Sequence, residues 1–170
     1  MPETTARKAK SLGLSAPEKL NETHDFSAFE CGEASIDAYV KRAHKAQAAK
    51  DAIVYVTCRK GSSQVLGFYT LTNGSVMRDT APKKLQRNAP SQCPVTILGR
   101  LGVDRTIQGH GIAVALLQDA IERSISVSEV VGSRAILVHA LDQGLAEFYK
   151  KHAGFIESSV SPLTLMLSLQ

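Results

Sequence analysis

The six residues from Gln108 to Ala113, QGHGIA, have the types and spacing to bind an anion. The two glycines, Gly109 and Gly111, let the backbone approach a ligand closely. An apolar pattern with helical spacing begins at Ile112, so several consecutive N–H groups are expected at a helix N-terminus, where the macrodipole favours negative charge. The pattern therefore predicts a phosphate or diphosphate site, with an ordinary glycine turn before a helix as the alternative.

Two common phosphate loops do not fit this stretch. A P-loop requires Gly-Lys-Ser/Thr after its last glycine, and the residues after Gly111 are Ile112 and Ala113. A dinucleotide fingerprint requires G-x-G-x-x-G near the start of an α/β unit, whereas only G-x-G is present here, two-thirds of the way along the chain. The stretch is therefore either a phosphate loop of another kind or an ordinary glycine turn before a helix.

A buried strand over 95–104, VTILGRLGVD, is expected to place this loop. Downstream, 134–140 is predicted as a second buried strand, 142–152 as a short helix and 153–155 as its glycine exit. The other expected elements are an ambiguous first strand over 12–20, a helix over 34–49, a hairpin of strands 52–58 and 65–72 with its turn at 60–63, a mostly irregular segment over 73–93 with a short helix near 82–87, a helix from 111 to about 129 with a break near 124–128, and two final strands over 155–160 and 163–169.

Length and composition favour one domain over 1–170, with a flexible tail at 1–10. The N-terminus lacks the apolar core of a signal peptide, and no apolar run is long enough for a membrane span. Three widely spaced cysteines suggest reduced thiols in the cytoplasm, and the five histidines show no metal-ligand spacing. We therefore expect a cytoplasmic protein without a metal.

The excess of positive charge lies in the middle of the chain. Residues 51–104 hold seven Lys/Arg against three Asp/Glu, whereas the segments on either side are nearly balanced. A second basic stripe lies on the helix predicted over 34–49. Such clusters indicate a polyanionic partner or, alternatively, a solvated face.

Two motifs together resemble the GNAT acetyltransferase superfamily. Gln108, Gly111 and Ala113 match its Q-x-x-G-x-A pyrophosphate loop, and residues 146–155, AEFYKKHAGF, resemble its terminal A-x-F-Y signature with a Gly-Phe exit. The resemblance implies an α/β fold, namely a single GNAT domain with a mixed, twisted sheet of about six to seven strands and about four helices. It implies acetyl-CoA as co-substrate and no metal.

A closer resemblance is to the GNAT toxins of toxin–antitoxin modules, and it covers about residues 26–169. Residues 29–40, FECGEASIDAYV, are similar to their F-x-C-G opening, 66–75 to their G-(F/Y)-Y-(S/T)-L stretch, 86–90 to their R-x-x-P loop and 98–104 to their L-(A/G)-R-L-A-V-D strand. Two departures are Lys151-His-Ala before Gly154, and Ala113 where many members have glycine.

Such toxins acetylate the α-amino group of aminoacyl-tRNA and block translation. The resemblance implies a ribbon-helix-helix antitoxin, contact with promoter DNA only through that antitoxin, and no membrane, and it is compatible with a homodimer. Two other functions stay open: a GNAT enzyme acting on a small-molecule or protein amine, and a non-catalytic CoA-binding interaction module. The sequence does not identify the amino acid or the tRNA.

Tyr149 is the residue that the resemblance assigns to catalysis, as the acid that protonates the CoA sulfur; a core tyrosine is the alternative. The implied cofactor-binding residues are Leu101, Gly102, Val103, Gln108, Gly109, His110, Gly111, Ile112, Ala113, Phe148 and Tyr149. The candidate tRNA-binding residues are Lys41, Arg42, Lys45, Lys83, Lys84, Arg87 and Arg100.

No carboxylate is an evident general base. Asp104 is expected to act as a turn or cap residue, and Glu147 to be solvated. An α-amino group has a pKa of about 7.7–8.0, against about 10.4 for lysine, so much of an aminoacyl α-amine is already neutral. This favours an α-amine substrate over a lysine. Arg100 stands out among the cations because it lies within an apolar strand; a buried ion pair is the alternative.

Overall fold

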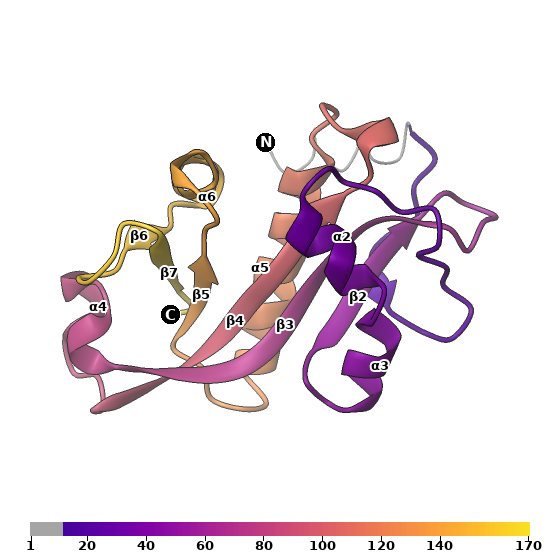
Figure 1. Cartoon of the computed structure of the whole chain (residues 1–170). Coiled ribbons are helices and arrows are strands. Elements are labelled where there is room, and N and C mark those ends of the chain that lie inside the picture. The colour runs from indigo at the N-terminus through magenta and orange to yellow at the C-terminus, as the bar shows by residue number, and fades with distance from the viewer. Residues whose placement is uncertain (1–11) are drawn as a thin grey trace. The chain divides into compact units, whose positions relative to one another are not determined.

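The computed structural model describes residues 12–170, so the tail expected at 1–10 lies outside the described residues (Figure 1). The described strands are β1 (Glu18–Lys19), β2 (Ile53–Cys58), β3 (Val65–Met77), β4 (Gln92–Val103), β5 (Ala135–His139), β6 (Ile156–Glu157) and β7 (Thr164–Ser168). The described helices are α2 (Ala34–Val40), α3 (Ala43–Ala48), α4 (Lys83–Gln86), α5 (Ile112–Ser128) and α6 (Gln143–Ala153), with the 3₁₀ turns η1 (Arg78–Thr80) and η2 (Arg105–Ile107).

The strands form a mixed sheet, as predicted. Their hydrogen-bonded order is β1-β2-β3-β4-β5-β7-β6. β4 and β5 are parallel, whereas the pairs β1–β2, β2–β3, β5–β7 and β6–β7 are antiparallel. This α/β architecture confirms the expected fold class.

Two compact units divide the chain, and each is described by itself. The first unit comprises the residues up to Leu71 together with Arg100–Ala120, and the second comprises Thr72–Gly99 and Ile121–Gln170. The strands β3 and β4 and the helix α5 each contribute residues to both units.

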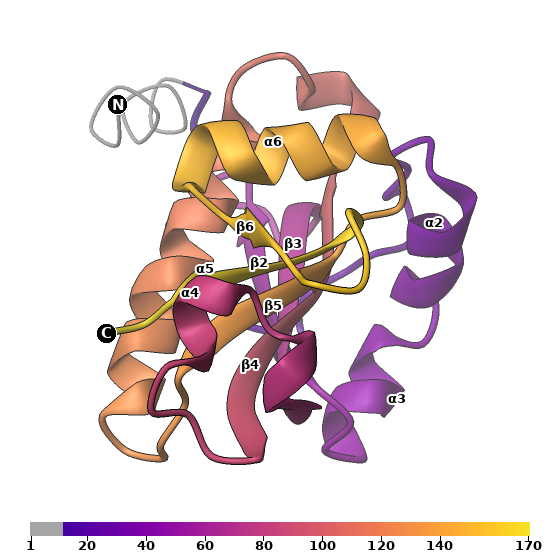
Figure 2. The ribbon, with the colours of Figure 1, turned by 90° about the vertical axis from the view of Figure 1, so that its left-hand side faces the viewer.

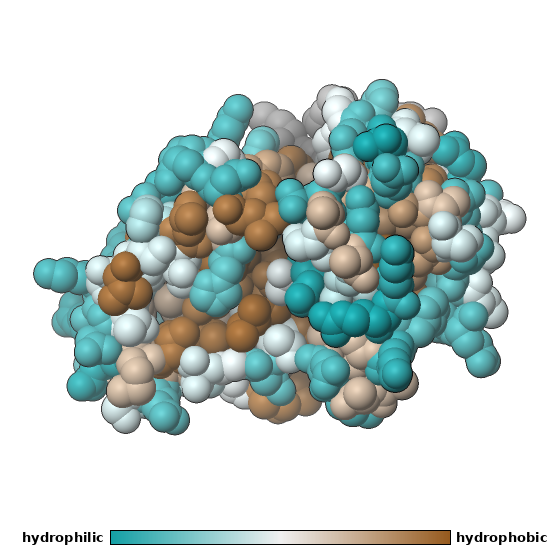
Figure 3. All heavy atoms as spheres, viewed as in Figure 1, coloured by the Kyte–Doolittle hydropathy of each residue, from teal (hydrophilic) through white to brown (hydrophobic). Residues whose placement is uncertain are grey.

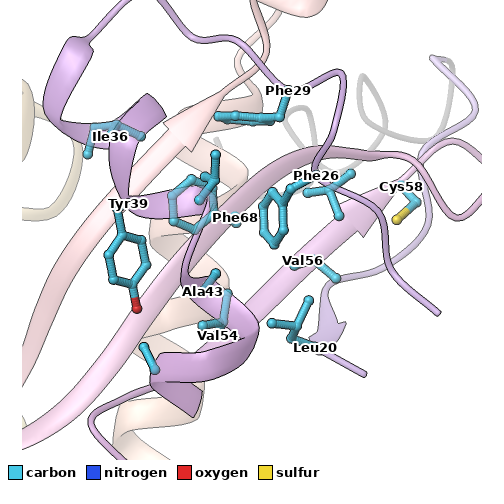
Figure 4. Packing of buried hydrophobic residues seen from close by; sticks show 13 residues of the cluster. Leu20, Phe26, Phe29, Ile36, Tyr39, Ala43, Val54, Val56, Cys58 and Phe68 are labelled. Atoms are coloured by element: carbon cyan, nitrogen blue, oxygen red, sulfur yellow. The ribbon is translucent and has the colours of Figure 1, made fainter. Parts of the chain in front are cut away.

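The core of the first unit is built around Phe68 on β3, which is fully buried. Phe26 and Phe29 meet its ring edge-on, with centroids 5.6 and 5.5 Å away, and Tyr39 stacks on it at 6.2 Å (Figure 4). Offset and edge-to-face aromatic contacts of this kind add about 0.5–1.5 kcal/mol each to the burial of the rings. They fix α2 and the segment before it against β3.

The single helix predicted over 34–49 is wrong, because the helix is broken into α2 and α3 at Lys41–Arg42. The Gln47 side chain on α3 donates to the Leu20 carbonyl oxygen and accepts from the Val54 N–H, both at 2.8 Å. These contacts, together with burial of Ala43, hold α3 against β2 and Leu20 as a helix separate from α2. They outweigh the helical propensity that would continue α2, which explains the error.

In the second unit, α6 packs against β7 (Figure 2). The unit's core contains Ala81, Val95, Ala135, Leu137 and Met166. Asp142 caps the N-terminus of α6, its carboxylate accepting from the Leu145 N–H at 2.8 Å, and Gly154 ends the helix with φ +74°. The predicted short helix and its glycine exit are therefore confirmed.

β3 runs further than the predicted strand 65–72 and ends at Met77. Asn73, Gly74 and Ser75 resemble a turn in sequence, yet they lie within the strand. A Cβ on Gly74 would lie 2.4 Å from Cδ1 of Ile97, so this glycine permits close packing in the second unit rather than a turn.

The parallel ladder between β4 and β5 is short. It joins Val95 to Ala135, Thr96 to Ile136 and Ile97 to Leu137, and no further pair is present among residues 12–170. Both strands continue beyond it, β4 to Val103 and β5 to His139. The ladder between them thus ends after three pairs, although both strands continue.

Other boundaries differ from the predictions at low-propensity residues. The helix α5 continues through Ser124, which is fully buried, where a break was expected. The ambiguous first strand shrinks to β1, with an isolated bridge from Leu14 to Arg59 before it. The strand predicted over 155–160 is limited to β6.

Candidate active site

The anion loop has the geometry that the sequence predicts. Gly109 and Gly111 have φ values of +83° and +77°, in the left-handed region where a side chain is costly. The Ala115 N–H donates to the Gly111 carbonyl oxygen, so Gly111 occupies the N-cap position of α5. The N–H groups of the next three residues, 112–114, therefore have no acceptor within the helix. Gly111 brings no side chain to cap them, and the first turn carries no acidic residue.

The side chain of Gln108 ties this loop to other parts of the first unit. Its Nε2 donates to the carbonyl oxygens of Cys31 and Val103, both at 2.8 Å. The side-chain amide of Gln108 thus binds backbone carbonyl groups of the protein. The N–H groups at the start of α5 remain available to a ligand. The sequence placed Gln108 in the loop but gave no indication of this internal contact.

Asp104 caps η2, as expected, and is buried. Its carboxylate accepts from the Thr106 N–H and hydroxyl at 3.1 and 2.6 Å, and from the Glu30 N–H at 3.0 Å. Burial favours the neutral acid, but these hydrogen bonds outweigh burial and hold the pKa of Asp104 below its usual value. A carboxylate so occupied is a structural group rather than a general base.

The end of β4 carries the backbone implied to contact the cofactor. A Cβ on Gly102 would lie 2.8 Å from Cγ2 of Ile36 and 3.1 Å from Cε1 of Phe68. Gly102 is therefore required by the packing of the first unit, whatever its role toward a ligand. Leu101 is half-buried, and Val103 is buried with its carbonyl oxygen bound to Gln108.

Tyr149 lies on the buried face of α6 in the second unit. Its ring contacts Phe148 and Phe155, with centroids 5.4 Å away in both cases. Burial raises the pKa of Tyr149 to about 12, which keeps the phenol protonated at cellular pH. Among the described residues, no hydrogen-bond partner is present for its hydroxyl, which is free to donate to a ligand. Glu147, in contrast, is exposed and bound to Lys150, as a solvated residue would be.

The candidate cations of the first unit fall into two kinds. Lys41 and Lys45 are exposed side chains on or near α2 and α3, where hydrophilic residues gather (Figure 3). The guanidinium carbons of Arg42 and Arg100 instead lie 5.0 and 4.2 Å from the centroid of the Tyr39 ring. The buried ion pair considered for Arg100 is absent among residues 12–170; its partner is an aromatic ring.

Two of the three candidate cations of the second unit line a small cavity of about 50 Å³. Lys84 and Arg87 line it, and Lys83 does not. Arg134 lines it as well and was missed by the sequence reasoning. The signal was an arginine at the first position of the buried strand predicted over 134–140, whereas Arg100 drew attention from within a strand.

Two classes of site find no support in the described part of the chain. No group of three or more His, Cys, Asp or Glu side chains is placed to hold a metal ion within residues 12–170. No helix there is long and apolar enough to cross a membrane.

Residues 21–155 match the Acetyltransferase (GNAT) family, and the chain belongs to this family. A tRNA-acetylating toxin of Mycobacterium tuberculosis is 43% identical over 159 residues, which cover 93% of this chain and 94% of that protein. The structure of AtaT complexed with acetyl-methionyl-tRNAfMet is similar with a TM-score of 0.83 and 31% identity, over 91% of this chain and 94% of AtaT. A mutant AtaT bound to the C-terminus of the antitoxin AtaR and acetyl-CoA is similar with a TM-score of 0.77 and 28% identity, over 92% of this chain and 94% of that one.

Proposed function

We propose that this protein is the toxin of a type II toxin–antitoxin module. Its proposed activity is transfer of the acetyl group of acetyl-CoA to the α-amino group of aminoacyl-tRNA, which blocks translation in the cytoplasm. The observation that carries the proposal is the 43% identity, over 93% of the chain, to a tRNA-acetylating toxin. Residues 1–170 would act as a single catalytic domain.

The proposed diphosphate site is the N-terminus of α5. The N–H groups of residues 108–113 would donate to the diphosphate, because the glycine backbone leaves room and the helix dipole favours the negative charge. Backbone groups of Leu101 and Val103 would bind the pantetheine amides and polarise the thioester carbonyl. His110 and Phe148 complete the proposed cofactor contacts.

The proposed reaction is a direct transfer. The neutral α-amine attacks the thioester carbonyl carbon, a C–N bond forms and the C–S bond breaks. Tyr149 donates its proton to the departing thiolate, and the surplus proton of the attacking nitrogen passes to water. Asp104 and Glu147 take no part as bases, because Asp104 is occupied by hydrogen bonds and Glu147 is paired with Lys150.

A direct test is acetylation by the purified protein. Incubation with labelled acetyl-CoA and a pool of aminoacyl-tRNAs should label the esterified amino acid, and sequencing of the labelled tRNA would identify the acceptor. Uncharged tRNA is the matched control, because it has the same phosphates and no α-amine. Absence of transfer to every aminoacyl-tRNA, with transfer to a polyamine or a protein terminus, would replace this function by the small-molecule or protein alternative.

The proposed RNA-binding surface includes Lys41, Arg42, Lys45 and Arg100 of the first unit and Lys83, Lys84 and Arg87 of the second unit. Two features support it. Within residues 12–170, none of these seven side chains is in an ion pair with a carboxylate, so their charge is available to phosphates. In addition, Lys84 and Arg87 share a cavity with Arg134, which adds a third cation at one place.

Replacing Lys83, Lys84 and Arg87 together with alanine should reduce acetylation of aminoacyl-tRNA by orders of magnitude. Each lost phosphate contact should also make the slope of log affinity against log salt shallower by about 0.7–0.9. Acetyl-CoA affinity and thermal stability should change little, because exposed charges contribute little to folding. Binding titrations with tRNA at several salt concentrations measure the slope.

The matched control replaces three other exposed cations, Arg59, Lys60 and Lys151, with alanine. It removes the same charge from outside the proposed surface, so it corrects for the general attraction between a basic protein and RNA. Equal losses in both triple variants would show that the residues around α4 have no special role in RNA binding.

An antitoxin should neutralise the protein. The proposed partner is a ribbon-helix-helix protein encoded beside this chain, with an acidic and apolar tail that covers the catalytic groups and basic surface. This proposal draws on the complex of AtaT with the C-terminus of AtaR. Co-expression of the adjacent small gene should restore growth and yield a co-purifying complex, whose mass, with that of the free toxin, reports whether the toxin is a homodimer.

Only the antitoxin should contact promoter DNA directly. The toxin should associate with that DNA only through the antitoxin. A tail-deleted antitoxin is the control, since it should keep DNA binding and lose neutralisation. Growth arrest that persists despite a stable, full-length antitoxin would show that this antitoxin is not the partner.

A further inference from the structure

Tyr39 carries two cations on one aromatic ring. The guanidinium carbon of Arg100 lies 4.2 Å from the ring centroid and that of Arg42 lies 5.0 Å from it, both within the range of a cation–π contact. The ring itself is fixed, because it is 4% exposed and stacks on the fully buried Phe68 with an interplanar angle of 14°. Tyr39 and Arg42 are three residues apart along the chain, and Arg100 comes from β4.

Neither guanidinium has a carboxylate partner within residues 12–170. Arg105 shows the contrast, because its Nη1 lies 3.4 Å from a carboxylate oxygen of Glu30. An arginine paired with a carboxylate uses its N–H fork on that partner, whereas one held over a ring keeps its donors for another group. The Tyr39 ring thus orders two guanidiniums without consuming their hydrogen-bonding capacity.

A pair of ordered guanidiniums with free donors is suited to phosphates. The planar fork binds two phosphate oxygens at once, and a second cation beside it matches the next phosphate of a nucleic acid backbone. A single small anion would need only one of them. The arrangement therefore favours a polyanionic chain over an isolated anion.

We propose that Tyr39 is a positioning residue that holds Arg42 and Arg100 for neighbouring phosphates of the RNA substrate. The inference rests on the proposed function, since that function supplies the RNA. It adds Tyr39, which is uncharged, to the proposed RNA-binding residues and assigns a positioning role to its ring. The two arginines act as one site, and the ring sets their spacing.

The hydroxyl of Tyr39 allows the contribution of the aromatic ring to be tested separately from that of the hydroxyl. It is buried and has no hydrogen-bond partner in the described chain; Figure 4 shows it at the end of the ring remote from Ile36. Tyr39→Phe removes this unsatisfied group and keeps the ring, whereas Tyr39→Leu removes the ring and keeps an apolar side chain. Arg100→Lys keeps the charge and removes the planar group that lies over the ring.

The experiment measures steady-state acetylation of aminoacyl-tRNA and, separately, binding of acetyl-CoA by calorimetry. Tyr39→Leu and Arg100→Lys should each raise KM for tRNA at least tenfold, with kcat and acetyl-CoA affinity within about threefold of the parent protein. Tyr39→Phe should keep the parental KM for tRNA. Arg100→Lys tests the inference even if Tyr39→Leu fails to fold. Arg59→Lys, at an exposed arginine outside the site, is the matched control for Arg100→Lys.

Two results would overturn the inference. One is an unchanged tRNA KM in Arg100→Lys or in folded Tyr39→Leu, which would leave the ring without a positioning role. The other is a loss in Tyr39→Phe as large as that in Tyr39→Leu, which would assign the effect to the hydroxyl. If the parent protein acetylated no aminoacyl-tRNA at all, the proposed function would fail before these variants were compared, so the two failures are distinguishable.

Discussion

Tyr149→Phe should lower kcat for acetylation by about 10²–10⁴-fold, the usual contribution of a positioned general acid. The change deletes one oxygen atom that has no hydrogen-bond partner among residues 12–170, and the Phe148 and Phe155 rings still pack against the new phenyl ring. Thermal stability and acetyl-CoA affinity should therefore stay close to those of the parent protein. Single-turnover acetylation with a radiolabelled acetyl group measures the chemical step, and loss of growth arrest on expression gives a cellular readout.

The control for this variant is Tyr55→Phe, which also removes a phenol oxygen but lies in the first unit on β2. It should retain the parental rate. If Tyr149→Phe transferred acetyl groups at nearly the parental rate as well, the general acid would have to be another group, such as a water molecule.

The pH profile gives an independent view of the same assignment. Because burial raises the pKa of Tyr149 to about 12, the acid stays protonated throughout the range in which aminoacyl-tRNA survives. The rate should therefore rise with pH as the α-amine loses its proton, with an apparent pKa of about 7.7–8.0, and then level off. A decline above about pH 8, with the protein still folded, would contradict an acid of such high pKa.

Gly111→Asp should abolish acetyl-CoA binding while leaving the fold intact. Aspartate is among the few side chains that tolerate the positive φ of Gly111. Gly111 is at the N-cap position of α5, so a carboxylate placed there would lie beside the N–H groups of the first turn. Those are the N–H groups proposed to bind the diphosphate, so the new side chain would both occupy them and repel the ligand. Loss of two charge-assisted hydrogen bonds of about 1.5–3 kcal/mol each corresponds to a weakening of about 10²–10⁴-fold.

Two variants control for other effects of this substitution. Gly111→Asn has nearly the same shape and tolerates the same positive φ, so the difference between Asn and Asp isolates the charge. Gly61→Asp places aspartate at a glycine with φ +79° in the turn between β2 and β3, away from the loop, and reports the cost of the backbone conformation. Calorimetry with acetyl-CoA is the measurement, and parental affinity in Gly111→Asp would exclude the loop as the diphosphate site.

The parts of the site that the sequence predicts well are those determined locally. Glycines at 109 and 111 specify positive φ, and an apolar helical pattern directly after them specifies the helix start, so the loop follows from adjacent residues. The same holds for α6, where Asp142 and Gly154 mark both ends. Asp104 directly follows a buried strand in the sequence, and it was correctly expected to be a turn or cap residue.

What the sequence does not predict depends on contacts between distant residues. Tyr39 and Arg100 are 61 positions apart in the sequence, so nothing in the local pattern indicates that their side chains meet. Gly74 looks like a turn residue until Ile97 is placed beside it. The break between α2 and α3 depends on Gln47 reaching the backbone of Leu20. In each case a tertiary contact overrides the local preference.

The short segment Glu30–Gly32 connects two parts of the first unit. On one side, the Cys31 carbonyl oxygen accepts from the Gln108 side chain of the anion loop. The Glu30 N–H donates to the Asp104 carboxylate, and the Glu30 carbonyl oxygen accepts from the Arg105 N–H. On the other side, the N–H groups of Cys31 and Gly32 donate to the carboxylate of Asp37 on α2. The loop and the start of α2 are thus joined through one set of hydrogen bonds.

This connection has a thermodynamic consequence for two ligands that bind the same molecule. A ligand that orders the anion loop would also restrict Glu30–Gly32, and so it would reduce the conformational entropy that a second ligand at α2 has to remove. The expected cooperativity is positive and reciprocal, because the factor by which the first ligand raises the affinity of the second equals the factor by which the second raises the affinity of the first. Order of binding would then affect the kinetics of assembly and leave the stability of the ternary complex unchanged.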